Sequence, residues 1–97
     1  MTELEFATVQ EEIAEAMKEK RKQQGLSLQE VADHMGIHMT SYRRIEIGQQ
    51  RLKIDEAIKA ENLLQFGLYE IMRRWAEEFN KPPKEIVIKG RTYRLAN

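Results

Sequence analysis

Few side chains in this chain could do chemistry. His34 and His38 lie four residues apart, a spacing that can place two metal ligands on one helix face, but Gly36 ends a helix between them. There is no cysteine, no glycine-rich phosphate loop and no nucleophile beside a plausible base. We therefore expect no metal site, no cofactor and no enzymatic activity.

Two adjacent arginines remain as candidates for binding. Arg43 and Arg44 lie on the polar side of a short segment, Met39–Ile47, in which Tyr42 and Ile45 have the spacing of an inward face. On an isolated helix such arginines are ordinary solvated side chains. Whether these two arginines form a binding site therefore depends on the helices that position them.

Residues 27–47 have the pattern of a helix-turn-helix. Ser27 and Glu30 match a capping box, which predicts a helix from Leu28, and Gly36 predicts its end near Met35. A tight turn then leads into the Met39–Ile47 helix. The inward positions of both helices carry apolar or small residues in one register: Val31, Ala32, Met35, Ile37, Tyr42 and Ile45. This agreement predicts two short helices in close contact.

Hydrophobic periodicity predicts three further helices. The first runs from Thr8 to Gln24, and the last from Leu68 to about Asn80. Between them, a helix from Ile54 to Gln65 follows the loop after Gly48. Its inner side is predicted to carry Ile54, Ala57, Ile58 and Leu64.

The last helix has the clearest apolar stripe in the chain, and two interpretations of it stay open. Its members are Leu68, Ile71, Met72, Trp75 and Phe79. The simpler interpretation is a packed core face. The alternative is a dimer interface formed by Leu68, Met72, Trp75 and Phe79.

The C-terminal segment is predicted to leave the helical pattern. Pro82-Pro83 forbids further helix, and Glu85–Leu95 alternates apolar and polar residues around a Lys89-Gly90 turn, which predicts a β-hairpin. The hairpin either caps the core or offers its edge to a second subunit, since a lone hairpin is only marginally stable. We expect a helix-turn-helix domain at 1–80 and a hairpin extension at 81–97.

Composition and charge limit the classes of protein to which this chain can belong. The chain has 97 residues, enough for one small domain, with 41% hydrophobic and 33% charged residues. Its net charge of zero argues against nucleic-acid binding when taken alone, yet the first sixteen residues carry five acids and no base, and four cations follow at 18–22. The lack of cysteine and of any membrane-length apolar run favours a cytoplasmic protein.

From Ile13 to Leu64 the chain resembles the lambda-repressor and Cro type helix-turn-helix family, also called the XRE family. The residues that carry the resemblance are Arg21, Gly25-Leu26-Ser27, Val31-Ala32, Gly36-Ile37, Ile45-Glu46 and Gly48. With the elements above, it implies an all-α, five-helix lambda-repressor-like fold with a short C-terminal hairpin. It also implies a structural ion pair between Arg21 and Glu46.

The resemblance further implies which residues meet double-stranded DNA, with the third helix in the major groove. Matching positions assign base contacts to Gln29, Met39, Thr40, Ser41 and Arg43, and phosphate contacts to Ser41, Arg44, Arg51 and Lys53. Arg43 is the strongest candidate, because a guanidinium can bond O6 and N7 of guanine together. Three positions depart from the family. Leu28 stands where glutamine is usual, His38 where serine commonly caps the helix, and Glu61 where the family favours small buried residues in the fourth helix.

These observations predict a sequence-specific DNA-binding transcriptional regulator. We expect a repressor of phage, plasmid or toxin-antitoxin type that binds a palindromic operator as a homodimer, with recognition helices about 34 Å apart. The alternative is a protein-interaction module whose partner is another protein, such as a cognate toxin. The zero net charge and the Trp75 stripe favour that alternative.

Overall fold

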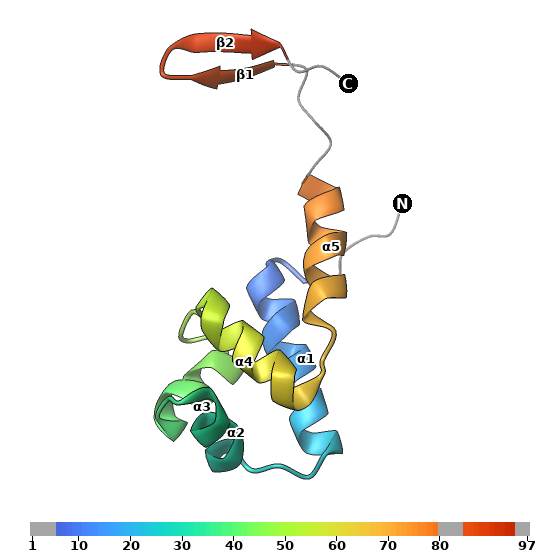
Figure 1. Ribbon diagram of the computed structural model, residues 1–97, viewed down its shortest axis with the longest axis vertical. Coiled ribbons are helices and arrows are strands. Elements are labelled where there is room, and N and C mark those ends of the chain that lie inside the picture. Colours follow the sequence, from blue (N-terminus) through green and yellow to red (C-terminus); the bar gives the residue numbers. More distant parts are fainter. Residues whose placement is uncertain (1–5, 80–84, 95–97) are drawn as a thin grey trace.

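The computed structural model describes residues 6–79 and 85–94. Five helices are followed by a two-stranded hairpin (Figure 1). Their bounds are α1 Val9–Gln23, α2 Leu28–Met35, α3 Met39–Glu46, α4 Ile54–Leu64, α5 Leu68–Phe79, β1 Glu85–Ile88 and β2 Arg91–Arg94. The all-α, five-helix prediction is confirmed. The predicted helix end at Asn80, Pro82-Pro83 and the hairpin end at Leu95 lie outside the described residues.

Local capping explains where the first two helices begin. The Thr8 hydroxyl accepts a hydrogen bond from the Glu11 amide at 3.1 Å. Ser27 and Glu30 form the predicted capping box, in which each side chain accepts from the other residue's amide, at 3.0 and 2.9 Å. These bonds satisfy amides that the first turn of a helix leaves without an intrahelical partner.

The turn between α2 and α3 needs a left-handed residue at its start. Gly36 takes this conformation with φ of 72°, and the Ile37 amide closes the end of α2 by donating to the Ala32 carbonyl at 3.0 Å. His38 precedes α3 but makes no side-chain capping bond, in agreement with imidazole being a poor cap.

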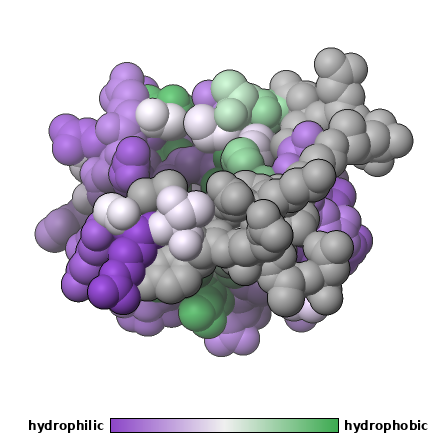
Figure 2. Space-filling view, turned by 90° about the horizontal axis from the view of Figure 1, so that it is seen from above, coloured by the Kyte–Doolittle hydropathy of each residue, from purple (hydrophilic) through white to green (hydrophobic). Residues whose placement is uncertain are grey.

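The core lies where α1, α2, α3 and α4 meet, and α5 covers it from the side of α1. Fully buried side chains include Met17, Val31, Met35, Tyr42, Ile45 and Leu64. Seen from the end of α5, the coloured surface is mostly hydrophilic, with separate hydrophobic groups between (Figure 2). Among the described residues, no helix is long and apolar enough to cross a membrane.

One predicted face is wrong. Ile54 and Ile58 were expected on the inner side of α4, but they are 61% and 59% exposed. Ala57 and Leu64 lie on the inner side as predicted, and Ala60 joins them there. These three residues follow helical steps of three and four, and two alanines let α4 lie close to α2.

The α5 stripe divides into two parts. Leu68 and Trp75, both proposed for a dimer interface, are buried in the chain's own core together with Ile71. Met72 and Phe79 are exposed. The expected interface therefore cannot contain Leu68 or Trp75, because the fold already covers them.

Polar contacts from distant segments hold α5 in place. The Trp75 indole N–H donates to Glu12 Oε1 at 2.9 Å, and Arg74 contacts the other oxygen of the same carboxylate. At the start of α5, Glu61 of α4 accepts from the amides of Gly67 and Leu68 at 2.8 and 3.1 Å. The start and the middle of α5 are thereby tied to α4 and α1.

The hairpin forms as predicted. Its strands are antiparallel, with Ile88 opposite Arg91. Lys89 and Gly90 have positive φ, 51° and 79°, as a two-residue type I′ turn requires. In Figure 1 the hairpin lies beyond the C-terminal end of α5, far from α2 and α3.

Candidate nucleic-acid interface

The helix-turn-helix is a rigid support for the outer face of α3. Tyr42 and Ile45 of α3 are completely buried, as are Val31 and Ala32 of α2, and the two helices pack directly on each other. Ala32 leaves room for this approach because its side chain is a single methyl group. With one side of α3 held in this way, its opposite side faces solvent.

The exposed side of α3 carries most of the residues predicted to contact bases. Met39, Thr40 and Arg43 are exposed, whereas Ser41 is half-buried at the edge of this face. Arg44 is also exposed, and its spacing of four residues from Thr40 places the two side chains on one stripe opposite the buried residues. Arg44 is thus as central on the outer face as Arg43.

Sequence reasoning did not identify Ile47 as part of this surface. It follows the last turn of α3 and is 54% exposed, in continuation of the Thr40–Arg44 stripe. An exposed isoleucine beside two arginines adds an apolar group that fits a thymine methyl. The seven-residue step from Thr40 was the signal that could have revealed it.

Gln29, on α2, is exposed as a base-reading residue must be, but its amide is already engaged. Its Nε2 donates to Asp33 Oδ1 at 2.6 Å, one turn later on the same helix. This bond uses one of the two N–H groups of the amide, so the amide oxygen and the second N–H of Gln29 are left to face outward. Asp33 is therefore a positioning residue that the sequence did not single out.

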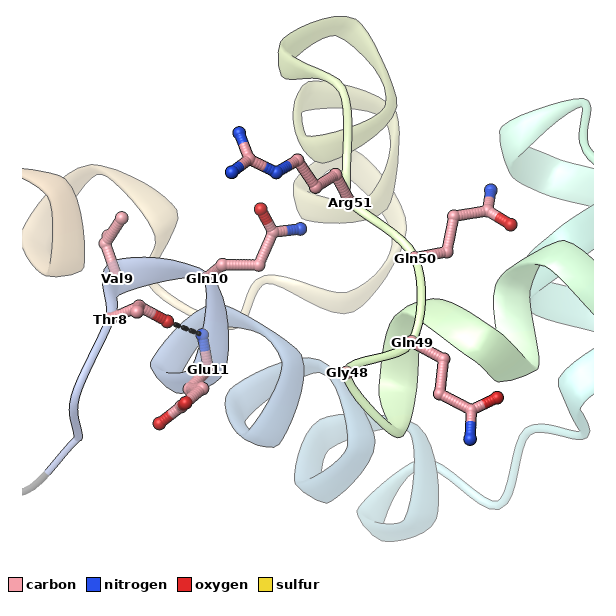
Figure 3. Close-up of a pocket in the computed structure, with 8 residues that line it drawn as sticks. All are labelled: Thr8, Val9, Gln10, Glu11, Gly48, Gln49, Gln50 and Arg51. Carbon is pink, nitrogen blue, oxygen red and sulfur yellow. Dashed lines mark hydrogen bonds between the residues drawn. The ribbon is translucent and has the colours of Figure 1, made fainter.

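The loop between α3 and α4 carries two predicted phosphate contacts, Arg51 and Lys53, and both are exposed. Arg51 borders an open groove of about 430 Å³ between this loop and the start of α1. Figure 3 shows the Arg51 and Gln10 side chains extending over this groove from opposite sides, while Gln49 and Gln50 point away from the start of α1.

The cations of this surface are not neutralised by neighbouring acids. Within residues 6–79 and 85–94, the ion pairs engage Arg21, Arg73 and Arg74, and none involves Arg43, Arg44, Arg51 or Lys53. A neutral chain thus has a local cationic surface that spans α3 and the loop after it. Such a surface attracts phosphate.

The end of α3 is anchored by the Arg21–Glu46 pair that the resemblance implied. The two side chains make a bidentate contact, with Arg21 Nε and Nη2 at 2.7 and 3.1 Å from the Glu46 oxygens. Arg21 Nη1 also donates to the Leu26 carbonyl at 3.0 Å. The hydrogen bond to Glu46 raises the pKa of Arg21, so the guanidinium stays charged. Burial raises the pKa of the neighbouring Tyr42 phenol, which stays neutral.

Nothing in the described part of the chain suggests a metal centre. His34 and His38 are both exposed, and no group of three potential ligands gathers among the described residues. Gly36 separates the two imidazoles, because the α2 helix ends there.

The chain is similar in sequence to a known transcriptional repressor. The chain is 29% identical over 69 residues to the transcriptional repressor RstR of the cryptic phage CTXphi from Vibrio cholerae. The match covers 71% of this chain and 62% of the relative, so the chain spans less than two thirds of that protein's length.

Solved structures show the same fold. The restriction-modification controller protein C.Esp1396I matches in wild-type form with a TM-score of 0.59 over 78% of this chain, and as a point mutant with 0.60 over 79%. All of each controller chain is covered, at 16% sequence identity.

A family model described as helix-turn-helix matches residues 17–71, which contain all of α2, α3 and α4. This match covers more than half of the chain and includes both the capping box and the buried α2–α3 contact. It confirms the resemblance drawn from the sequence and the prediction that the chain is not an enzyme. The chain belongs to the helix-turn-helix family of the XRE type.

Proposed function

We propose that this protein is a sequence-specific DNA-binding transcriptional regulator that places α3 in the major groove of a palindromic operator. The observation that carries the proposal is the outer face of α3, where Arg43 and Arg44 are exposed and have no carboxylate partner among the described residues. Membership of the helix-turn-helix family and the likeness to a phage repressor support a role in repression.

The residues of this surface divide into two roles. Arg43 is proposed to bond O6 and N7 of a guanine, and Met39 and the Thr40 methyl to contact thymine methyls. Gln29 offers an amide oxygen, which suits the amino group of cytosine or adenine. Phosphates are assigned to Ser41, Arg44, Arg51 and Lys53, and the central position of Arg44 also allows it to reach a base.

We propose that the operator is bound by a homodimer. Exposed apolar side chains on α4 and α5 form what we call the α4–α5 apolar surface: Ile54, Ile58, Tyr69, Met72 and Phe79. Ile54 and Met72 border the same groove, so the two helices meet along part of this surface. Large exposed apolar patches mark interaction sites, and a second copy buries the same patch on both sides.

Selection from a random duplex library tests the proposal. We expect enrichment of a site with two inverted half-sites, centred about one helical turn apart, and binding that weakens steeply with salt. A library from which no duplex sequence is enriched would contradict sequence-specific binding. Enrichment of a site without inverted symmetry would contradict the dimer.

The net charge of zero favours a second candidate, a module that binds a protein partner such as a cognate toxin. Its partner would cover the α4–α5 apolar surface in place of a second copy. The two candidates differ in their salt response. Protein binding through an apolar surface changes little with ionic strength, whereas DNA binding falls steeply.

A further inference from the structure

The C-terminal segment of this chain carries a net positive charge, whereas the rest of the chain is net negative. Residues 80–97 contain five lysines or arginines and a single acidic residue, Glu85, a formal charge of +4. Because the whole chain is neutral, residues 1–79 carry −4. A body with net negative charge is repelled by a polyanion at long range, so the tail contributes a large share of any attraction to DNA.

Internal ion pairs further reduce the number of cations in the helical body that are available to bind phosphate. Arg21 binds Glu46, Arg73 binds Glu70 and Glu77, and Arg74 binds Glu12. A paired guanidinium must give up its carboxylate before it can neutralise a phosphate. The cations available for DNA are therefore the few around α3, the lysines of α1 and those of the tail.

The hairpin displays its cations at an exposed tip. Lys89 lies in the turn and Arg91 begins β2, and both are exposed. Among the described elements each strand packs mainly against the other, not against the helices. Two cations thus stand two residues apart on a protruding, ordered turn.

The tip can reach a duplex held by α3. The five residues between α5 and β1 span at most about 17 Å, and strands of this length add about 13 Å. The sum, about 30 Å, is close to one turn of DNA. The molecule is 50 Å long, with the helix-turn-helix near one end and the hairpin at the other (Figure 1). A duplex that followed this axis from α3 would pass the hairpin as well.

We propose that the C-terminal hairpin is a basic arm that binds phosphates of the duplex whose bases α3 reads. The inference rests on the proposed function and adds a second contact region to it. Phosphate contacts carry no sequence information, so the arm raises affinity without changing the preferred site. Neutralisation by phosphate also removes the repulsion between Lys89 and Arg91, which stabilises a hairpin that is marginal alone.

The test is a full-length double variant, Lys89→Asn/Arg91→Thr. Asn-Gly is the preferred type I′ turn and threonine favours strands, so the hairpin keeps its local preferences while losing two charges. The matched control, Lys59→Gln/Arg73→Gln, removes two charges from exposed positions of α4 and α5. Affinity for the duplex selected by the wild-type protein is measured at several salt concentrations, together with the sedimentation coefficient.

We expect the slope of log affinity against log salt to fall by about 1.8 per protomer in the double variant and to stay unchanged in the control. At 0.1 M salt this corresponds to binding weakened by roughly 60-fold for each protomer that contacts the duplex. The selected sequence should not change. If the double variant has the same salt slope as the wild-type protein, the hairpin is not a DNA-binding arm, but the proposed function still stands. If the slope is unchanged and the dimer becomes a monomer, the hairpin makes a protein contact instead, which also contradicts the proposal. Absence of duplex binding by the wild-type protein would instead overturn the proposed function.

Discussion

Arg21 of α1 and Glu46 of α3 form a bidentate ion pair that ties the end of the recognition helix to the first helix. Only 14% of the Arg21 side chain and 5% of the Glu46 side chain are exposed. Since Glu46 immediately follows the outward residues of α3, the pair controls how that surface is presented.

Replacing Arg21 with methionine should lower the free energy of unfolding by about 3 kcal/mol, because Glu46 is left buried without a partner. The double variant Arg21→Met/Glu46→Leu should recover most of this loss. Arg73→Met provides the control, since its exposed pair contributes at most about 1 kcal/mol. Urea unfolding followed by Trp75 fluorescence measures all three. Equal effects of Arg21→Met and Arg73→Met would show that burial of the first pair has no energetic consequence.

Glu61 should stabilise α5 through its bonds to the first amides of that helix. Glu61→Ala is expected to lower the free energy of unfolding by about 1–2 kcal/mol, and Glu61→Gln by less, since its amide oxygen still accepts. Asn62→Ala, at the exposed next position of α4, is the control and should change stability little. If Glu61→Ala leaves the free energy of unfolding unchanged, water must satisfy these amides equally well.

The α4–α5 apolar surface should be required for the homodimer but not for the fold. Ile58→Glu places a charge in the proposed interface and should convert the dimer to a monomer in sedimentation equilibrium. Because Ile58 is exposed in the single chain, the helical circular dichroism of the monomer should be retained. Lys59→Glu, one residue further on, should leave the dimer intact. If Ile58→Glu sediments as the wild-type protein does, the interface lies elsewhere.

Base and phosphate contacts should differ in what their loss does to binding. Arg43→Ala should cost about 1–3 kcal/mol and relax the preference at one base position. Arg51→Ala should weaken binding to all sequences alike and lower the salt slope by about one for each protomer. Repeating the library selection with each variant separates the two. An unchanged preference for Arg43→Ala, with a changed one for Arg44→Ala, would assign the guanine contact to Arg44.

The sequence alone determined the helix-turn-helix, because its signals are local. The capping box at Ser27–Glu30 and the left-handed residue Gly36 act within one or two turns of the chain, and they set the start and end of α2 wherever the rest of the molecule lies. The Lys89-Gly90 turn specified the hairpin for the same reason. The family resemblance rested on these features together with the inward register of Val31 and Tyr42.

Tertiary structure alone decided which apolar residues are covered. Ile54 and Ile58 fit the helical period as well as Ala57 does, and Trp75 fits it as well as Met72, yet the neighbouring helices bury Ala57 and Trp75 and leave the other three exposed. Periodicity defines an apolar side of a helix without saying how much of it a neighbour will cover.

Sequence patterns also could not predict the hydrogen bonds that orient α5. Glu12 and Trp75 are 63 positions apart, and Glu61 reaches past a turn to the start of the next helix. Neither pair has a local signature, because each exists only once the helices have packed. Helix boundaries follow from interactions within a few residues, whereas the surfaces available to a partner depend on packing between segments distant in the chain.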